Sequence, residues 1–431
     1  TAFSQNVLKS FNEDVIVVTD KSKLAGLSEG EIAGLAAAAK KAGKEGYMIT
    51  LVNTTQQPIL SSLENRELRE QIFTASANRA AQTNGPIIIE ETNLRAQKAE
   101  LLGYKDWASY VMTSRMAQTT ENVYGILDDL APKAVEKAKI EAAAIQKVIN
   151  DSGESFELKP WDWAFYAEKV RAEKYDLDPA LVKPYFEMNS VINDGLFFAM
   201  NKLYGITFKE RQDLPVYHED VTVYEVFNAD GSAIGLFYMD PYAREGKRGG
   251  AWMSAYVSQS GLKGTKPVIY NAQNIPKPAE GEPTLMTFDE VSTMFHEFGH
   301  AAHGLFSDVK YPSLAGTATA RDFVEFPSQA HEDWMIEPSV LANYAKHYKT
   351  GEPIPQALLD KVLASQKFNQ GFGTTEYLAA ALLDMEWHSF GSDRKINDVQ
   401  EFENAALKAH GIDYYPVPPR YKSNYFSHTF A

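Results

Sequence analysis

Residues 288–306 of the chain are FDEVSTMFHEFGHAAHGLF, and His296, Glu297 and His300 within them form the pattern HExxH. On an α-helix, residues four positions apart lie on one face, one turn apart. His296 and His300 can therefore offer two imidazole nitrogens to one metal ion at ~2.0–2.1 Å. Glu297 projects beside that metal, where it can act on a bound water. The stretch matches the signature of zinc peptidases.

The residues around this pattern predict a buried amphipathic helix. Thr287 and Glu290 have the spacing of a capping box, in which each side chain bonds the backbone N–H of the other. Apolar residues then recur every three or four positions, which is the spacing of a buried helical stripe: Val291, Phe295, Phe298, Ala302 and Leu305. Two histidines buried on such a helix need a metal or hydrogen bonds to offset their desolvation.

A catalytic zinc needs a third protein ligand and one open position. One zinc-peptidase class places a third histidine six residues after the second, with a glycine midway. Here those positions hold Phe306 and His303, which excludes that class, and we expect a surface or hydrogen-bonded role for His303. The remaining option is an acidic residue further on. Spacing alone does not choose among Asp322, Glu325, Glu332 and Asp333.

HEFGHAAHGLF followed by GTATARDFVEFPSQ resembles the thimet-oligopeptidase family of zinc metallopeptidases, and within it the bacterial dipeptidyl carboxypeptidases. The resemblance extends over most of the chain, through LVNTTQQP (51–58), LLGYKDWASY (101–110), PWDWAFYAEKVR (160–171), YAREGKRGGAWM (242–253) and PPRYKSNYFSH (418–428). It implies one zinc ion per chain, with the glutamate of the DFVE stretch, Glu325, as the third ligand.

Composition sets limits on partners and location. The 431 residues carry a formal net charge of −15, which argues against a nucleic-acid partner and against attraction to anionic membranes. No apolar run approaches the ~18 residues of a membrane span. The absence of cysteine rules out disulfides and cysteine ligands. We expect a monomer in the cytoplasm, although a chain without cysteine suits a periplasm equally well.

The predicted fold is mainly α-helical, with a small antiparallel sheet before the metal helix. Helices are predicted over 60–83 and 87–102, separated by Asn84-Gly85-Pro86, and REGKRGG (244–250) is predicted as a loop. The resemblance implies two halves around a deep channel. We expect a zinc-binding half at 171–364, opposite a half made of 1–170 and 365–431. Both chain ends are abrupt, so we expect the chain to be part of a longer polypeptide.

Further residues in two stretches of the sequence are candidates for substrate binding and catalysis. Gly250 and Ala251 begin a predicted strand at a sheet edge, where a peptide could add as a further strand; a bulged strand end is the alternative. His428 matches the family's active-site histidine and would donate to the oxyanion. Arg420 or Lys422 would hold a substrate carboxylate, unless both are surface charges.

The resemblance implies hydrolysis of oligopeptides with release of C-terminal dipeptides. Zinc would polarise the scissile carbonyl, and Glu297 would take the proton of the attacking water. One alternative within the family is an endo-acting oligopeptidase. An alternative of another class is a catalytically incomplete fragment that binds zinc or peptide without turning it over.

Overall fold

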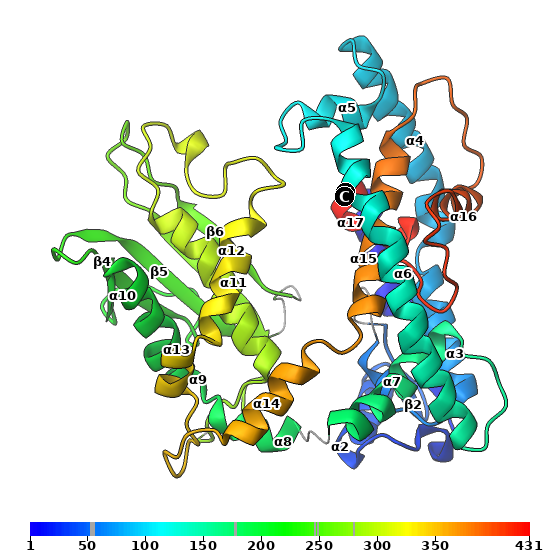
Figure 1. Cartoon of the computed structure of the whole chain (residues 1–431), viewed down its shortest axis with the longest axis horizontal. Helices are drawn as coiled ribbons and strands as arrows, with labels where there is room; N and C mark the ends of the chain where they lie inside the picture. The colour runs from blue at the N-terminus through cyan, green and yellow to red at the C-terminus, as the bar shows by residue number, and fades with distance from the viewer. Residues whose placement is uncertain (52–56, 176–178, 245–246, 248–249, 279–280) are drawn as a thin grey trace. The chain divides into compact units, whose positions relative to one another are not determined.

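The computed structural model describes residues 1–51, 57–175, 179–244, 247, 250–278 and 281–431. The chain forms two compact units (Figure 1). Unit 1 consists of Thr1–Asp176 and Ala364–Ala431, and unit 2 of Leu177–Leu363. The functional division at 171–364 expected from the resemblance stays a prediction.

Unit 2 contains the predicted metal helix and a five-stranded sheet. Its strands are β3 (Thr207–Glu210), β4 (Thr222–Phe227), β5 (Ala233–Tyr242), β6 (Trp252–Val257) and β7 (Val268–Ile275). Its helices are α8 (Pro179–Val182), α9 (Met188–Ser190), α10 (Phe198–Tyr204), α11 (Phe288–Leu305), α12 (Glu325–Glu332) and α13 (Pro338–Tyr344), and α14 (Gln356–Ser365) spans the boundary with unit 1.

The strand order in this sheet is β3-β4-β5-β7-β6. The pairs β3/β4, β4/β5 and β6/β7 are antiparallel, as the sequence predicts. The pair β5/β7 is the parallel exception in this mainly antiparallel sheet. The reason is topological: β6 follows β5 in the chain but lies outside β7, so β7 returns between them in the direction of β5. Within the described residues, β6 therefore forms one edge of the sheet.

Helix α11 packs against β7, β6 and β5. The ring of Phe298 lies 5.1 Å from that of Phe237 on β5 and 5.7 Å from that of Phe208 on β3. Phe237, Phe295 and Phe298 are fully buried in the main core of unit 2. Rings at these separations bury a large apolar area and fix the rotation of α11 about its axis. The face of α11 opposite to Phe298 therefore points away from the sheet.

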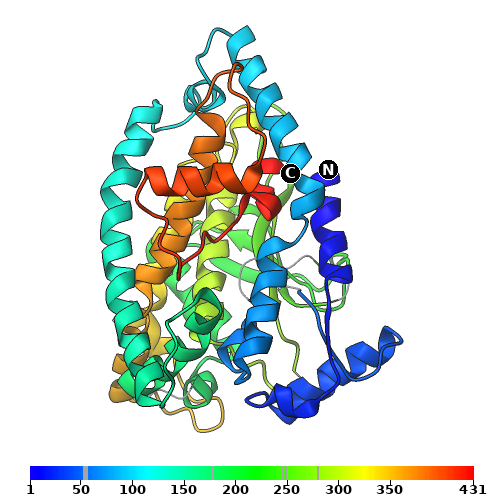
Figure 2. The same cartoon turned by 90° about the vertical axis from the view of Figure 1, so that its right-hand side faces the viewer.

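Unit 1 is mostly helical (Figure 2). Its first segment holds the antiparallel pair β1 (Ile16–Val18) and β2 (Tyr47–Ile49). Its helices are α1 (Ala2–Glu13), α2 (Glu29–Lys41), α3 (Arg66–Asn78), α4 (Ala81–Leu101), α5 (Trp107–Met112), α6 (Thr120–Asp151), α7 (Pro160–Tyr175), α15 (Gln370–His388), α16 (Val399–Ala409) and α17 (Ser427–Phe430). The long helices α6 and α15 lie side by side, and Phe3 of α1 contacts Phe430 of α17 with ring centroids 5.8 Å apart.

The predicted break at Asn84-Gly85-Pro86 is wrong. Helix α4 runs through these residues, and the chain instead turns at Ala80, whose φ is +54°. Asn84 is fully buried, and its side-chain amide donates to the carbonyl oxygens of Phe3 and Asn424. These tertiary hydrogen bonds, which local sequence does not reveal, hold the helix across a proline that local propensity disfavours.

Among the described residues, every helix is too short or too polar to cross a lipid bilayer.

Candidate metal centre

The N-terminus of α11 forms as the sequence predicts. The Thr287 hydroxyl accepts from the Glu290 backbone N–H at 3.1 Å, and the Glu290 carboxylate accepts from the Thr287 N–H at 2.7 Å. The predicted apolar stripe is buried along its whole length, with exposed fractions of 2% or less. This capping box and stripe together orient the HExxH residues.

Helix α12 approaches α11 closely because residue 299 is glycine. A Cβ atom built on Gly299 would lie 2.6 Å from the Cα of Ser328 and 3.1 Å from the carbonyl oxygen of Pro327. Real Cβ atoms essentially never come that close to backbone. Only glycine at this position allows the start of α12 to reach the level of the two histidines.

This close approach brings three side chains together. The Nε2 atoms of His296 and His300 each lie 3.1 Å from Oε2 of Glu325, the first residue of α12. The three residues offer donor atoms that all lie within 4.8 Å of one another, and among the described residues they are the group suited to a metal. Atoms bound at ~2.0–2.1 Å around a tetrahedral ion are separated by roughly 3.3 Å. The observed separations fit that arrangement.

The hydrogen bonds around these side chains favour a cation between them. His296 Nδ1 lies 2.7 Å from Oε1 of Glu332, a carboxylate that only accepts, so Nδ1 carries the hydrogen. In the neutral ring, Nε2 then presents a lone pair toward the oxygen of Glu325. Burial opposes the charged form of His296, but its hydrogen bond to Glu332 and the nearby carboxylates raise its pKa overall, whereas burial lowers the pKa of His300. A ring nitrogen of a neutral histidine that carries no hydrogen is the atom with which histidine binds a metal.

A second partner fixes the Glu325 carboxylate. The hydroxyl of Ser328, a fully buried residue, donates to Oε2 of Glu325 at 3.0 Å and contacts its carbonyl oxygen at 2.9 Å. Carboxylates and histidines that bind metals usually have such outer hydrogen bonds, which set their orientation. Glu332, which spacing left open as a possible ligand, instead lies on the far nitrogen of His296.

Glu297 lies one residue after His296, with an exposed fraction of 6%. Its Oε2 is buried and has no hydrogen-bond partner among the described residues. Burial raises the pKa of this carboxyl group to about 7. A buried carboxylate oxygen without a partner is costly, and this one lies beside the convergent donors. A carboxyl group whose pKa lies near neutral pH can accept a proton and later return it.

The structure also describes most of the predicted substrate-binding edge. Gly250 and Ala251 directly precede β6, the edge strand, whereas Gly249 lies outside the described residues. Gly250 has a φ of +82°, a conformation that residues with a side chain rarely adopt. Its carbonyl oxygen accepts from the side-chain amide of Asn274 on β7 at 2.6 Å. The start of the strand is therefore held in one place.

His428 and Arg420 belong to unit 1, whereas the convergent donors belong to unit 2. His428 is exposed on α17, with its ring 5.0 Å from that of Tyr421. Arg420 already has a carboxylate nearby, since its Nη1 lies 3.6 Å from Oε1 of Glu376. Binding a substrate carboxylate there would require competing with Glu376. The roles of His428 and Arg420 stay predictions.

Two features of this centre were not predicted from the sequence. Glu332 was not identified as the partner of His296, because a carboxylate seven residues past Glu325 resembles any exposed helix residue. Gly299 was not identified as a packing residue. A glycine in the middle of a strongly apolar helix was the available signal, since glycine there costs ~1 kcal/mol unless close packing requires it.

Comparison with known proteins identifies the family of the chain. Residues 59–431 match the model for peptidase family M3. The chain is 47% identical to the dipeptidyl carboxypeptidase of Escherichia coli and 45% identical to that of Salmonella typhimurium, each over 100% of the chain and 64% of the relative. It is 36% identical to oligopeptidase A of E. coli, over 90% of the chain and 58% of that protein. The chain thus spans a little under two thirds of these relatives.

Proposed function

Since the chain belongs to peptidase family M3, we propose that it hydrolyses oligopeptides with one zinc ion per chain and releases dipeptides from their C-termini. The family match bears out the resemblance noted in the sequence. The dipeptidyl carboxypeptidases of two enterobacteria, at 47% and 45% identity, support the dipeptide-releasing reaction over internal cleavage. The bacterial oligopeptidase A relatives are less similar, at 32–37% identity.

The observation that carries the proposal is the convergence of His296 Nε2, His300 Nε2 and Glu325 Oε2 beside an unpaired oxygen of Glu297. Two imidazoles and one carboxylate are the ligand set of several catalytic zinc sites. Structural zinc sites are closed by four protein ligands, whereas this group has three. Three ligands leave one position for water or substrate.

We assign a separate role in the reaction to each residue of the site. When bound, zinc supplies Lewis acidity for the scissile carbonyl and the attacking water. Glu297 accepts the proton of that water and then donates it to the leaving amine. Glu332 and Ser328 hold His296 and Glu325 in orientation through hydrogen bonds.

We further propose that the substrate backbone pairs with the edge strand β6, beginning at Gly250 and Ala251. An extended peptide added to a sheet edge gains main-chain hydrogen bonds that do not depend on its side chains. This suits an enzyme that accepts varied oligopeptides. His428 as oxyanion donor and Arg420 as carboxylate partner are carried over from the resemblance alone. A cytoplasmic location and a monomeric state also remain predictions from the sequence.

The test is product analysis on a pair of matched substrates. An N-acetylated hexapeptide with a free C-terminus and its C-terminal amide are incubated with the zinc-loaded chain, and products are identified by mass spectrometry. A chelator-treated sample is the control for metal dependence. We expect dipeptides to leave successively from the free acid, with the amide cleaved much more slowly, because amidation removes the charge that a carboxylate site pairs with.

Each outcome decides between the alternatives. Equal cleavage of acid and amide, at internal bonds, would replace dipeptide release by an endo-acting oligopeptidase. Stoichiometric zinc with no cleavage of either peptide would show a metal-binding chain without turnover.

A further inference from the structure

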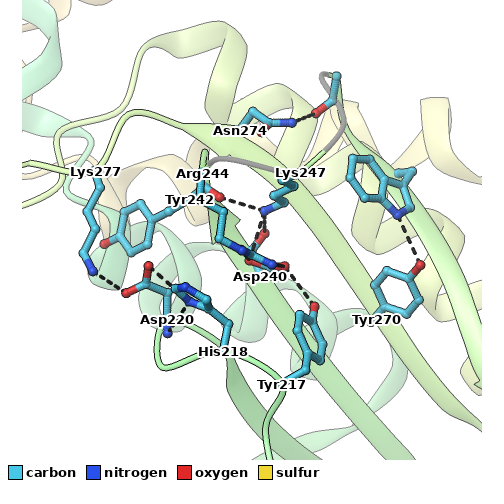
Figure 3. Close-up of polar contacts among 12 residues, drawn as sticks. Tyr217, His218, Asp220, Asp240, Tyr242, Arg244, Lys247, Tyr270, Asn274 and Lys277 are labelled. Carbon is cyan, nitrogen blue, oxygen red and sulfur yellow. Dashed lines mark hydrogen bonds and ion pairs between the residues drawn. The ribbon is translucent and has the colours of Figure 1, made fainter.

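A second charged cluster lies in unit 2, between the end of β5 and the start of β6 (Figure 3). Asp240, with 2% of its surface exposed, stands at its centre. Arg244 pairs with both carboxylate oxygens, at 2.6 and 2.8 Å, and the hydroxyl of Tyr217 donates to Oδ2 at 2.9 Å. Lys247 Nζ lies 2.9 Å from Oδ1. One buried carboxylate thus binds two cations and a phenol.

Lys247 is the most buried cation of this cluster, with 3% of its side chain exposed. Its ammonium has three hydrogens and three acceptors: Oδ1 of Asp240, the carbonyl oxygen of Asp240 and the carbonyl oxygen of Tyr242, the carbonyls both at 2.8 Å. A buried ammonium is costly unless it is fully paired in this way. Lys247 therefore ties the chain after β5 to the backbone of β5 itself.

The cluster does not belong to the metal centre. Phe237 of β5 packs against Phe298 of α11, so its side of the sheet faces the metal helix. Asp240 is three residues further along the strand and precedes the bulge, so its side chain points to the opposite face. Lys247 and its partners accordingly lie on the sheet face away from α11.

The cluster does lie beside the edge strand. Ala272 of β7 is the pairing partner of Asp240 on one side and of Trp252, the first residue of β6, on the other. The chain passes from Tyr242 through Lys247 to Gly250 before β6 begins. Asp240 and Tyr242 of β5 bind the Lys247 ammonium, and Asn274 of β7 binds the Gly250 carbonyl oxygen at 2.6 Å. The side chains of Lys247 and Asn274 are drawn in Figure 3.

We propose that Lys247 is a positioning residue for oligopeptide binding: its three hydrogen bonds fix the start of β6 in the register that an added peptide strand requires. This inference rests on the proposed function and names a residue that acts through Gly250 and Trp252 without touching substrate. Main-chain hydrogen bonds are directional and weaken steeply with misalignment. A small shift of the edge strand therefore weakens several of them at once.

The variant that tests the inference is Lys247→Met, which keeps an unbranched side chain that is one atom shorter and removes the ammonium. Arg244 still neutralises Asp240 in this variant, so no buried charge is left unpaired. The matched control is Lys277→Met, which removes an exposed lysine that pairs with Asp220 close to the same sheet (Figure 3). Asn274→Ala removes the second anchor of Gly250 and tests the same idea independently of Lys247.

We expect Lys247→Met to raise KM for the hexapeptide by about tenfold or more, with kcat changed less than about threefold and zinc content unchanged. When contacts that are equally strong in the ground state and the transition state are lost, KM rises and kcat stays unchanged. Asn274→Ala should raise KM in the same way by a smaller factor, and Lys277→Met should leave both constants unchanged. Unchanged KM in Lys247→Met, or a fall confined to kcat, would overturn the inference.

Hydrogen exchange measured on the same proteins separates this inference from the proposed function. In Lys247→Met, the amides of β6 that pair with β7 should exchange faster, whereas those of β3 and β4 should not change. A uniform increase across unit 2, or none in β6, would contradict a positioning role. An inactive wild-type chain would refute the proposed hydrolysis, while the exchange data would still decide whether Lys247 holds β6.

Discussion

Unit 2 contains two clusters of charged side chains, and they differ in how completely their hydrogen-bonding groups are satisfied. Around Asp240, the carboxylate binds Arg244, Lys247 and Tyr217, and each hydrogen of the Lys247 ammonium has an acceptor. Around His296, the donors converge on each other, and Oε2 of Glu297 has no partner among the described residues. The closed cluster stabilises a backbone connection. The open one offers three ligand atoms that could hold a metal ion.

The largest effect is expected from removing one of the three side chains that converge around His296. Glu325→Ala should abolish stoichiometric zinc binding. Two imidazoles alone hold the cation poorly, and the variant lacks the negative charge nearest to it. Glu332→Ala removes only the partner of His296 and should weaken zinc by about 10–100-fold. Metal analysis after dialysis against graded free zinc measures both. Zinc retained in Glu325→Ala and lost in Glu332→Ala would exchange the roles of the two carboxylates.

A smaller effect is expected from the glycine that lets α12 approach. Gly299→Ala places a methyl group 2.6 Å from the Cα of Ser328, so α12 must move away and carry Glu325 with it. We expect a loss of ~1–3 kcal/mol in the free energy of unfolding, as for other overpacked sites, together with weaker zinc binding. Chemical denaturation and zinc titration are the measurements.

The control for Gly299→Ala is Gly34→Ala in the interior of α2, where a Cβ meets nothing within 4 Å. That change should be neutral or stabilising by ~0.5–1 kcal/mol, since alanine is the better helix former. If Gly299→Ala behaved like Gly34→Ala, the close approach of the two helices would not be needed for the metal centre.

The smallest effect is expected in the closed cluster. Tyr217→Phe removes one hydrogen bond to Asp240, whose charge remains paired with Arg244 and Lys247. We expect a loss of ~1–2 kcal/mol in the free energy of unfolding and no change in zinc affinity. Thermal unfolding with and without zinc checks this. A change in zinc affinity in Tyr217→Phe would mean that the two clusters are coupled.

Much of the metal helix is predictable from sequence, because its determinants are local. The capping box of Thr287 and Glu290 and the three- and four-residue spacing of its apolar stripe lie within a single segment. The identity of the third ligand is not local. Four carboxylates were compatible with spacing, and the close packing of Gly299 against Ser328 brings Glu325 up to the two histidines.

Other features depend on contacts that local patterns do not reveal. A strand has the same alternation whether its neighbour is parallel or antiparallel, so the pairing of β5 with β7 was not predicted. The glycine-rich segment REGKRGG has the composition of an exposed loop, yet its Lys247 is buried because three acceptors of β5 surround it. Local composition predicted the loop, and tertiary hydrogen bonds determine the burial.

The central claim is that an open metal centre uses Glu297 as its proton acceptor, and Glu297→Gln tests it most directly. Zinc content and hydrolysis rate are measured on the same sample, with Asp289→Asn, an exposed carboxylate in the first turn of α11, as the control. The amide keeps the shape of Glu297 and cannot accept the proton, so we predict one zinc per chain and a rate lower by ~10²–10⁴-fold. Full zinc with more than about a tenth of the wild-type rate would contradict the account.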